Sequence, residues 1–278
     1  MDLYRGMDRA ALATAYNNRA VVAGWQGYLD RWKARSDALY ASRPVVRDLR
    51  YGAGPRQRVD LFPSGRANAP AILFLHGGYW QWNDKEGQAF VAEGLLARGF
   101  DVAIGEYSLA PQAKMDSICA EIPALLGFLG AELSARGLGA GGLYVSGIST
   151  GAQLAALALG DPSVRGALLI SGIYDLEPIR LSPLNDAIGM GRDEARAYSP
   201  LHAIPPSTAP AIVAFGADER PEIRRQSNDY ASALAALDRA VAVRPIAGAD
   251  HFSVLETFAD PDGELACAAE GLARGLLL

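Results

Sequence analysis

YVSGISTGAQLAALAL, residues 144–159, says more about the architecture of this 278-residue chain than any other stretch. An apolar, strand-like run leads into the pentapeptide GISTG, residues 147–151, and a helix-like run of alanines and leucines follows at once. The spacing G-x-S-x-G between a strand and a helix is typical of a sharp turn that presents its serine, here Ser149, at the edge of a sheet. The bare pattern also arises by chance, so its strand–turn–helix context gives it weight.

Strand-like and helix-like segments alternate on both sides of this turn, from about residue 46 onward. The alternation predicts an α/β fold in which a mostly parallel, eight-stranded sheet is flanked by helices. The strands are expected near residues 46–51, 57–62, 71–76, 101–105, 142–146, 166–171, 210–216 and 241–246. The helices are expected near residues 84–98, 114–135, 150–160, 223–237 and 252–276, the last one broken around Pro261.

Two segments lie outside this pattern, in what is otherwise expected to be a single domain over residues 1–278. Residues 1–45 include apolar side chains at helical spacing, which predicts a helical N-terminal segment near the rim of the sheet. Residues 173–209 are rich in proline and glycine, which disfavours a regular sheet element. They are interpreted as a small cap-like insertion between the sixth and seventh strands.

Composition narrows the class of partner. The chain has 26 Lys and Arg residues against 31 Asp and Glu residues, a formal net charge of −5. Without a basic stripe, neither nucleic acid nor an anionic membrane is an expected partner. The first residues lack the continuous apolar core of a signal peptide, and the nearly uncharged run 122–133 is shorter than the about 20 residues that cross a bilayer. A cytoplasmic protein that acts on small molecules is therefore expected, and the sequence leaves a homodimer open.

The two cysteines, Cys119 and Cys267, stand far apart in the sequence. Their spacing does not match that of a metal site, and a lone cysteine most often packs as a small hydrophobic residue. Both are therefore expected to be buried, free thiols in a reducing compartment. Neither a cofactor nor a metal ion is expected.

Ser149 is the candidate nucleophile. Its neighbours Gly147 and Gly151 fit a turn that approaches the adjoining strand and helix so closely that side chains cannot be accommodated. Ser149 then stands at the N-terminus of a helix, where unpaired N–H groups favour developing negative charge. The alternative is a glycine-rich helix start in which Ser149 only caps the helix.

A serine needs a positioned base, usually a histidine, to become a nucleophile. Of the three histidines, His76 belongs to a glycine motif ahead of Ser149, and His202 lies in the proline-rich insertion. His251 follows the last expected strand. Because loops at the carboxyl ends of parallel strands converge at one edge of a sheet, His251 is predicted to lie near Ser149 and act as the general base. The alternative is a helix-capping or surface histidine.

A third group should hold the imidazole of His251 in the right tautomer. The expected strand 210–216 ends just before Asp218 and Glu219, so either carboxylate is a candidate. Asp250 is a poor candidate because adjacent side chains rarely bend back onto each other. The residue pattern leaves Asp218 and Glu219 both open.

The motif HGGYW, residues 76–80, follows an apolar, strand-like run and is predicted to stabilise a developing oxyanion. The backbone N–H groups of Gly78 and Tyr79 would join that of Thr150, the residue after the candidate nucleophile, in holding the anion. His76 would orient this loop through its ring. The alternative is an ordinary strand-to-helix turn whose aromatic side chains pack in the core.

Together these motifs resemble the α/β-hydrolases, and within them the kynurenine formamidase (arylformamidase) branch of esterase-like enzymes. HGGYW is a specific marker of that branch, and three further stretches match it: YNNR at 16–19, YSLAP at 107–111 and PEIRRQS at 221–227. The resemblance covers nearly the whole chain and implies an α/β-hydrolase fold. Matching the last stretch without gaps puts the family's acid at Glu219. Family members commonly carry histidine and alanine where this chain has Ile148 and Thr150.

The resemblance implies a serine hydrolase that cleaves a small amide or ester through an acyl-enzyme, most readily an aryl formamide such as N-formylkynurenine. Aromatic rings beside the nucleophile offer a flat surface to an aromatic leaving group. The side chains expected to contact substrate are Tyr79, Trp80, Trp82 and Ile148.

Three arginines of the insertion are candidates for binding a substrate carboxylate, although a solvated surface is the more common role: Arg180, Arg192 and Arg196. Two other functions stay open. A carboxylesterase or other amidase would use the same triad on a different small substrate. A non-catalytic binding protein would keep the fold alone, since a fold does not establish an activity.

Overall fold

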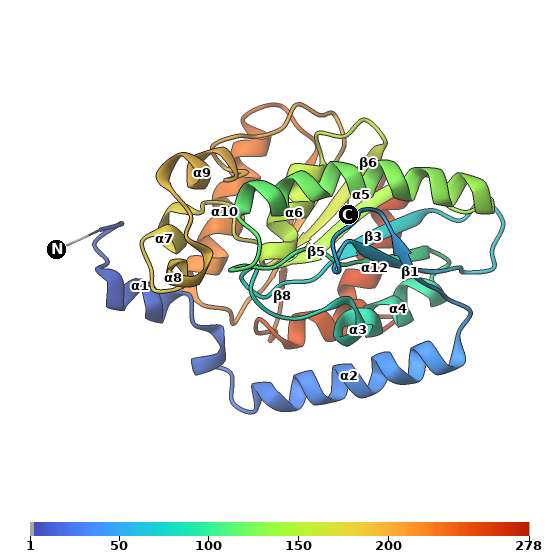
Figure 1. The fold of residues 1–278 in the computed structure, drawn as a ribbon, viewed down its shortest axis with the longest axis horizontal. Helices are drawn as coiled ribbons and strands as arrows, with labels where there is room; N and C mark the ends of the chain where they lie inside the picture. The colour runs from blue at the N-terminus through green and yellow to red at the C-terminus, as the bar shows by residue number, and fades with distance from the viewer. Residues whose placement is uncertain (1–2, 278) are drawn as a thin grey trace.

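An eight-stranded sheet forms the centre of the computed structural model, which describes residues 3–277 (Figure 1). The strands lie in the order β1-β2-β4-β3-β5-β6-β7-β8. The pairings of β2 with β1 and with β4 are antiparallel, and the other pairings are parallel. The strands are β1 (Val46–Arg50), β2 (Arg58–Phe62), β3 (Ala71–Leu75), β4 (Asp101–Gly105), β5 (Leu143–Ile148), β6 (Val164–Ile170), β7 (Ala211–Gly216) and β8 (Val241–Ile246). The prediction of a mostly parallel, eight-stranded sheet is confirmed.

Helices connect the strands and cover both faces of the sheet (Figure 1). In the N-terminal half they are α1 (Arg9–Ala15), η1 (Asn18–Ala20), α2 (Trp25–Ser42), α3 (Lys85–Gln88), η2 (Ala89–Val91), α4 (Ala92–Ala97) and α5 (Met115–Arg136). They continue as α6 (Thr150–Ala158), α7 (Glu177–Arg180), α8 (Asn185–Ile188), α9 (Arg192–Ala197), α10 (Pro221–Ala235), η3 (Ser253–Leu255), α11 (Glu256–Ala259) and α12 (Glu264–Ala273).

The helix expected over 84–98 is divided into α3, η2 and α4. In this stretch the Phe90 N–H donates to the Ser36 hydroxyl of α2 at 2.9 Å instead of to a carbonyl of its own helix. A side chain that captures a backbone donor in this way competes with regular helix. The helix expected over 252–276 is interrupted before α12, in the region of Pro261 as expected.

Alternate residues of the central strands belong to two separate hydrophobic cores. In β3, Ala71, Leu73 and Leu75 belong to the core under α5, α6 and α10, whereas Ile72 and Phe74 belong to the core under α2, α4, α11 and α12. Successive side chains of a strand point to opposite faces, so a strand that is apolar throughout must be covered on both. The uninterrupted apolar runs of the central strands therefore reflect burial on both faces of the sheet.

Helix α5 is, among the described helices, the one whose length and composition would let it cross a membrane. Its apolar residues Ile118, Ile122 and Leu125 are fully or almost fully buried in the same core as Leu73 of β3. The apolar face of α5 is therefore used to cover the sheet.

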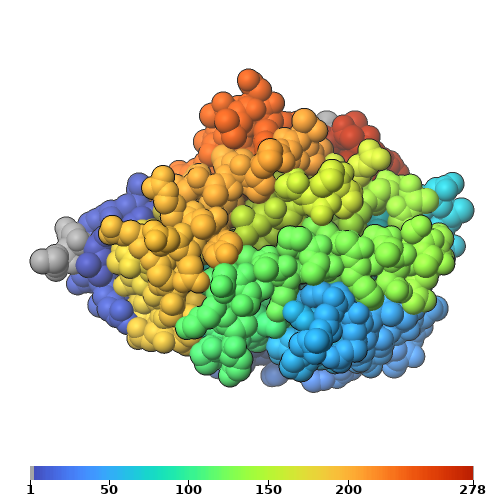
Figure 2. All heavy atoms as spheres, turned by 45° about the horizontal axis from the view of Figure 1, so that its top comes forward, coloured from blue at the N-terminus to red at the C-terminus, as the bar shows by residue number. Residues whose placement is uncertain are grey.

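The N-terminal segment and the cap-like insertion lie next to each other. Arg9 of α1 forms an ion pair with Asp186 of α8 at 2.6 Å, and the Tyr4 hydroxyl donates to Asp175 at 2.7 Å. Figure 2 shows the yellow insertion between the blue N-terminal residues and the green part of the chain that includes α5. Both segments thus pack beside the sheet, and the insertion holds only short helices, α7, α8 and α9.

The two cysteines differ from each other. Cys119 of α5 is a buried free thiol, as expected, but Cys267 of α12 is exposed. The expectation for Cys267 was wrong because its helix turns this position away from the sheet, toward the guanidinium of Arg98, whose Nη2 lies 3.0 Å from the sulfur.

Candidate active site

Ser149 occupies a strained turn between β5 and α6. Its backbone has φ 57° and ψ −119°, a combination that residues with a side chain rarely adopt and that tends to occur at functional sites. The turn is held because the Ser149 N–H donates to the carbonyl of Ile170 in β6 at 2.8 Å. The Ser149 side chain makes no capping hydrogen bond to α6, so a role as a simple helix cap does not fit.

The glycines on either side of Ser149 are required by close contacts. A Cβ atom on Gly151 would lie 2.1 Å from the carbonyl oxygen of Leu75, and one on Gly147 would lie 2.5 Å from the carbonyl carbon of Gly151. Real Cβ atoms are not found at such distances, so any larger residue would push α6 away from β3. The G-x-S-x-G spacing is thus explained by packing of the turn against the sheet.

His251 and Glu219 meet at the carboxyl ends of β8 and β7. The Nδ1 atom of His251 lies 2.9 Å from Oε2 of Glu219, whose carboxylate is fully buried. The other oxygen, Oε1, accepts the Gly216 N–H at 2.8 Å and a short hydrogen bond from the Ser171 hydroxyl. With both oxygens occupied, Glu219 fixes the orientation of the His251 ring and favours the tautomer with its proton on Nδ1.

The neighbouring carboxylates are directed elsewhere. Asp218 is exposed, and its N–H donates to the Ala249 carbonyl. Asp250 accepts the N–H groups of Phe252 and Ser253, both at 2.8 Å, and so stabilises the turn into η3. Of the three candidate acids in this region, the structure places Glu219 against His251.

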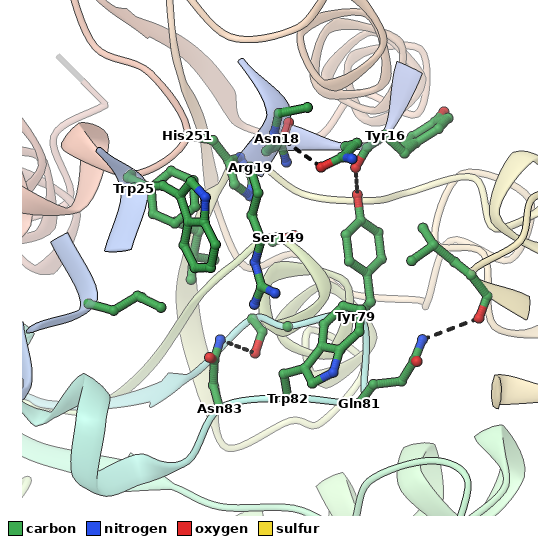
Figure 3. Close-up of a pocket in the computed structure, with 18 of the residues that line it drawn as sticks. Tyr16, Asn18, Arg19, Trp25, Tyr79, Gln81, Trp82, Asn83, Ser149 and His251 are labelled. Atoms are coloured by element: carbon green, nitrogen blue, oxygen red, sulfur yellow. Dashed lines mark hydrogen bonds between the residues drawn. The ribbon is translucent and has the colours of Figure 1, made fainter. Parts of the chain in front are cut away.

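Ser149 and His251 line the same cavity, of about 680 Å³ (Figure 3). Within residues 3–277, the Ser149 hydroxyl and the His251 ring are not joined by a hydrogen bond. Such bonds are often long in proteins without bound substrate and shorten when the substrate arrives. The His251 side chain is 12 % exposed and lines the cavity that also holds Ser149, and its Nε2 is the ring nitrogen that Glu219 does not engage.

The HGGYW loop forms another wall of this cavity. Gly78 and Tyr79 have φ values of 118° and 51°, and the Gly78 carbonyl accepts the N–H groups of Gln81 and Trp82 at 2.9 and 3.0 Å. Within residues 3–277, the N–H groups of Gly78 and Tyr79 donate to no other group. A tight turn with two free donors is what binding of an oxyanion requires.

Tyr79 ties this loop to the N-terminal segment. Its hydroxyl donates to the Tyr16 carbonyl at 2.6 Å. Burial raises the pKa of the Tyr79 hydroxyl well above its ordinary value, so the group stays a neutral donor. The loop is also held at its start, where the Asn83 side chain donates to the Gly77 carbonyl at 3.1 Å.

His76 is sealed beneath the loop. Its Nε2 lies 2.9 Å from Oε1 of Glu106, its Nδ1 lies 2.8 Å from the Gly77 carbonyl, and its ring stacks on Tyr107 at 4.4 Å. Burial alone would raise the pKa of Glu106, but His76 and Arg56 and the Lys85 N–H together hold that pKa below its ordinary value. His76 therefore supports the loop and does not reach the cavity.

Sequence comparisons identify the family of this chain. The BD-FAE family model matches residues 59–161. The kynurenine formamidase of Salmo salar is 32 % identical over 231 residues, which is 77 % of each chain. That of Danio rerio is 30 % identical over 250 residues, or 84 % of each chain. The chain belongs to the kynurenine formamidase family.

Solved structures place this family member among the α/β-hydrolases. A Silicibacter protein provisionally named a thioesterase has a TM-score of 0.81 and 29 % identity, covering 92 % of this chain and 97 % of its own. An esterase of Pyrobaculum calidifontis has a TM-score of 0.73 at 18 % identity, covering 96 % and 97 %. The second likeness shows the fold alone. The predicted α/β-hydrolase fold and the resemblance to kynurenine formamidases are confirmed, and the protein is a hydrolase.

One expected substrate contact is absent from the cavity of this kynurenine formamidase relative. Tyr79, Trp82 and Ile148 line the cavity, but Trp80 does not. Trp80 is 0 % exposed, and its Nε1 donates to the Gln153 side chain at 3.1 Å. The left-handed backbone at Tyr79 and Trp80 turns this one aromatic side chain inward, against α6, so the expectation for Trp80 has to be corrected.

The remaining sequence candidates lie outside the cavity. Arg180 is paired with Glu177 of its own helix, and His202 faces Asp175 at 3.3 Å. Neither Arg192 nor Arg196 is among the described residues that line the cavity. No residue from these candidates therefore contacts the space in front of Ser149.

The N-terminal segment supplies residues that sequence reasoning missed. Arg19, Trp25 and Trp32 line the cavity, together with Phe252 after β8. The motif YNNR at 16–19 pointed to the family, but nothing in its residue types places Arg19 beside Ser149. The aromatic residues have helical spacing, which is typical of residues that pack a helix against a core.

Proposed function

We propose that this chain hydrolyses an aryl formamide, and that N-formylkynurenine is the first substrate to test. One observation carries the proposal: Ser149 stands on a strained turn in the same cavity as His251, whose Nδ1 is held by the buried carboxylate of Glu219 at 2.9 Å. A nucleophile, a base and a group that orients the base are the parts that acyl transfer needs. Membership of the kynurenine formamidase family supports the formamide as substrate.

In the proposed reaction, the Ser149 hydroxyl attacks the formyl carbon while Nε2 of His251 takes its proton. Glu219 accepts the Nδ1–H of His251 and stabilises the imidazolium that forms. Collapse of the tetrahedral intermediate breaks the C–N bond, and His251 returns the proton to the departing aryl amine. Water then attacks the formyl-enzyme by the same route and releases formate.

The negative charge of each tetrahedral intermediate would rest on the N–H groups of Gly78, Tyr79 and Thr150. The first two lie on the turn of the HGGYW loop, and Thr150 is the first residue of α6. Each such donor is worth roughly 2.7–4 kcal/mol of transition-state stabilisation. The positive end of the α6 dipole adds to this at the same place.

Aromatic side chains support an aromatic leaving group. Tyr79 and Trp82 meet edge to face at 6.3 Å, and both line the cavity. Trp25 and Phe252, whose rings approach each other at 6.3 Å, also line the cavity. Such walls bind a flat ring through apolar contact and the ring quadrupole. The two free cysteines, Cys119 and Cys267, support the cytoplasm as the proposed location.

The direct test compares kcat/KM for N-formylkynurenine with kcat/KM for short p-nitrophenyl esters, using wild type and Ser149→Ala. The proposal expects the formamide to be the better substrate and expects Ser149→Ala to abolish turnover of both. A formamide value far below the ester values would favour a carboxylesterase instead. Equal rates for wild type and Ser149→Ala would favour a non-catalytic binding protein.

A further inference from the structure

The cavity in front of Ser149 carries an unbalanced positive charge. Among the described residues that line it there is no aspartate or glutamate, and Arg19 is the side chain with a permanent charge. A cationic group in an otherwise apolar and amide-lined cavity attracts an anionic part of a ligand. The lining therefore favours a ligand with an anionic group.

The Arg19 guanidinium is held in place by two tryptophans. Its central carbon lies 4.6 Å from the ring centre of Trp25 and 5.0 Å from that of Trp82, and Figure 3 shows the side chain between them. Stacking covers the faces of the guanidinium but leaves its N–H edges free to donate. Within residues 3–277, Arg19 forms no ion pair and no side-chain hydrogen bond. Its donors are therefore available to a ligand.

The backbone that carries Arg19 is fixed from two sides. Buried Tyr16 receives a hydrogen bond from Gln226 of α10 at 2.7 Å and donates to Glu222 at 3.0 Å. The Tyr16 carbonyl accepts the Tyr79 hydroxyl, and the Asn17 side chain accepts the Ala20 N–H at 3.2 Å. Arg19 therefore has a defined position relative to the HGGYW loop, as a specificity residue needs.

We propose that Arg19 binds the carboxylate of the substrate, so that the cavity selects aryl formamides that carry a carboxylate over formamides that lack it. The formamide part of this inference rests on the function proposed above. The carboxylate part rests on the cavity alone. Arg19 thereby becomes a specificity-determining residue, supplied by the N-terminal segment.

The test uses a matched pair of substrates, N-formylkynurenine and its decarboxylated analogue, which keeps the ammonium but lacks the carboxylate. The measured quantity is the ratio of their kcat/KM values. Arg19→Gln is expected to lower this ratio roughly 10- to 100-fold, the worth of a charge-assisted hydrogen bond. Arg19→Lys keeps the charge but loses the planar guanidinium, so its kcat/KM ratio should lie between those of wild type and Arg19→Gln. Arg180→Gln removes an arginine outside the cavity and should leave the ratio unchanged.

Binding of kynurenine separates this inference from the proposed function. Calorimetry measures the Kd of kynurenine and of its decarboxylated analogue, without any need for turnover. Wild type should bind kynurenine more tightly than the decarboxylated analogue, and Arg19→Gln should lose that preference, even if neither formamide is cleaved. Absence of the preference in wild type, or its persistence in a folded Arg19→Gln variant, would overturn the role of Arg19.

Discussion

Two histidine–glutamate pairs span the carboxyl ends of neighbouring parallel strands in this molecule. His76 follows β3 and meets Glu106 after β4, and His251 follows β8 and meets Glu219 after β7. In each pair a ring nitrogen lies 2.9 Å from a carboxylate oxygen. The paired atoms thus have the same separation, and the difference between the pairs lies in what surrounds them.

The two pairs differ in whether the histidine can reach the cavity. The His76 ring is 0 % exposed and both of its nitrogens face oxygen atoms, so no nitrogen is left to exchange a proton with a substrate. The His251 ring is 12 % exposed, only its Nδ1 is engaged by Glu219, and it lines the cavity that contains Ser149. Access of the second nitrogen to the cavity, rather than the pairing itself, identifies the proposed base.

The largest expected effect follows from removing the base. His251→Gln keeps a donor for Glu219 but cannot accept the Ser149 proton, so kcat should fall about 10⁴- to 10⁶-fold. Steady-state kinetics on the preferred substrate, with a thermal melt to verify folding, would measure this. In His76→Gln the main loss should instead appear in the melt. A similar fall in kcat per folded molecule for both variants would contradict the claim that His251, and not His76, is the base.

The second effect tests the orienting acid. Glu219→Gln should lower kcat about 10⁴-fold, because an amide can stabilise the wrong imidazole tautomer and no longer compensates the imidazolium. Asp218→Asn is the matched control one residue earlier on an exposed loop, and it should change kcat less than about threefold. If the control were the damaging substitution, the assignment of the acid to Glu219 would be wrong.

The third effect concerns stability. Glu106→Gln leaves His76 and Arg56 without their buried anion and should lower the free energy of unfolding at pH 7 by about 3–5 kcal/mol. The folded pKa of Glu106 is depressed, so its contribution is present above the ordinary value of about 4.3 and is lost as the pH falls through the folded value.

Urea unfolding at neutral and at acid pH would follow this change. The gap in unfolding free energy between wild type and Glu106→Gln should narrow below about pH 4. A gap of the same size at both pH values would mean that the charge of Glu106 is not what stabilises the buried pair.

The smallest effect separates two tryptophans on the loop above His76. Trp80→Phe leaves the buried Gln153 oxygen without its donor and part of the indole volume unfilled, and it should cost about 1–3 kcal/mol of stability with KM unchanged. Trp82→Ala should raise KM for an aromatic substrate several-fold, because its ring lines the cavity. The reverse pattern would show that Trp80, and not Trp82, contacts the substrate.

Most of the fold could be predicted because its signals are local. The apolar runs of the strands and the glycine-flanked serine depend on contacts that each segment must make, so spacing and residue type reveal them. The convergence of strand ends then placed Ser149 and His251 at one edge of the sheet without any distance information. The choice of Glu219 over Asp218 came from the family resemblance, and the structure places Glu219 against His251.

The parts that could not be predicted depend on distant contacts. Whether Trp80 faces the cavity is decided by the backbone turn at Tyr79 and Trp80, which the residue types do not reveal. Arg19 is brought to the cavity because its neighbour Tyr16 is held by hydrogen bonds from α10 and from the HGGYW loop. Both of these partners lie more than 60 residues from Tyr16 along the chain. The exposure of Cys267 likewise follows from the orientation of α12 on the sheet.

Activation of Ser149 by His251 can be measured by labelling with a serine-directed fluorophosphonate, followed by peptide mass spectrometry. One phosphonylated residue, Ser149, is expected, and labelling should be at least about 100-fold slower in His251→Gln, since the serine is a weak nucleophile without its base. His76→Gln should slow labelling far less. A label on another residue, or labelling of His251→Gln at the wild-type rate, would contradict the claim that the cavity-facing pair activates Ser149.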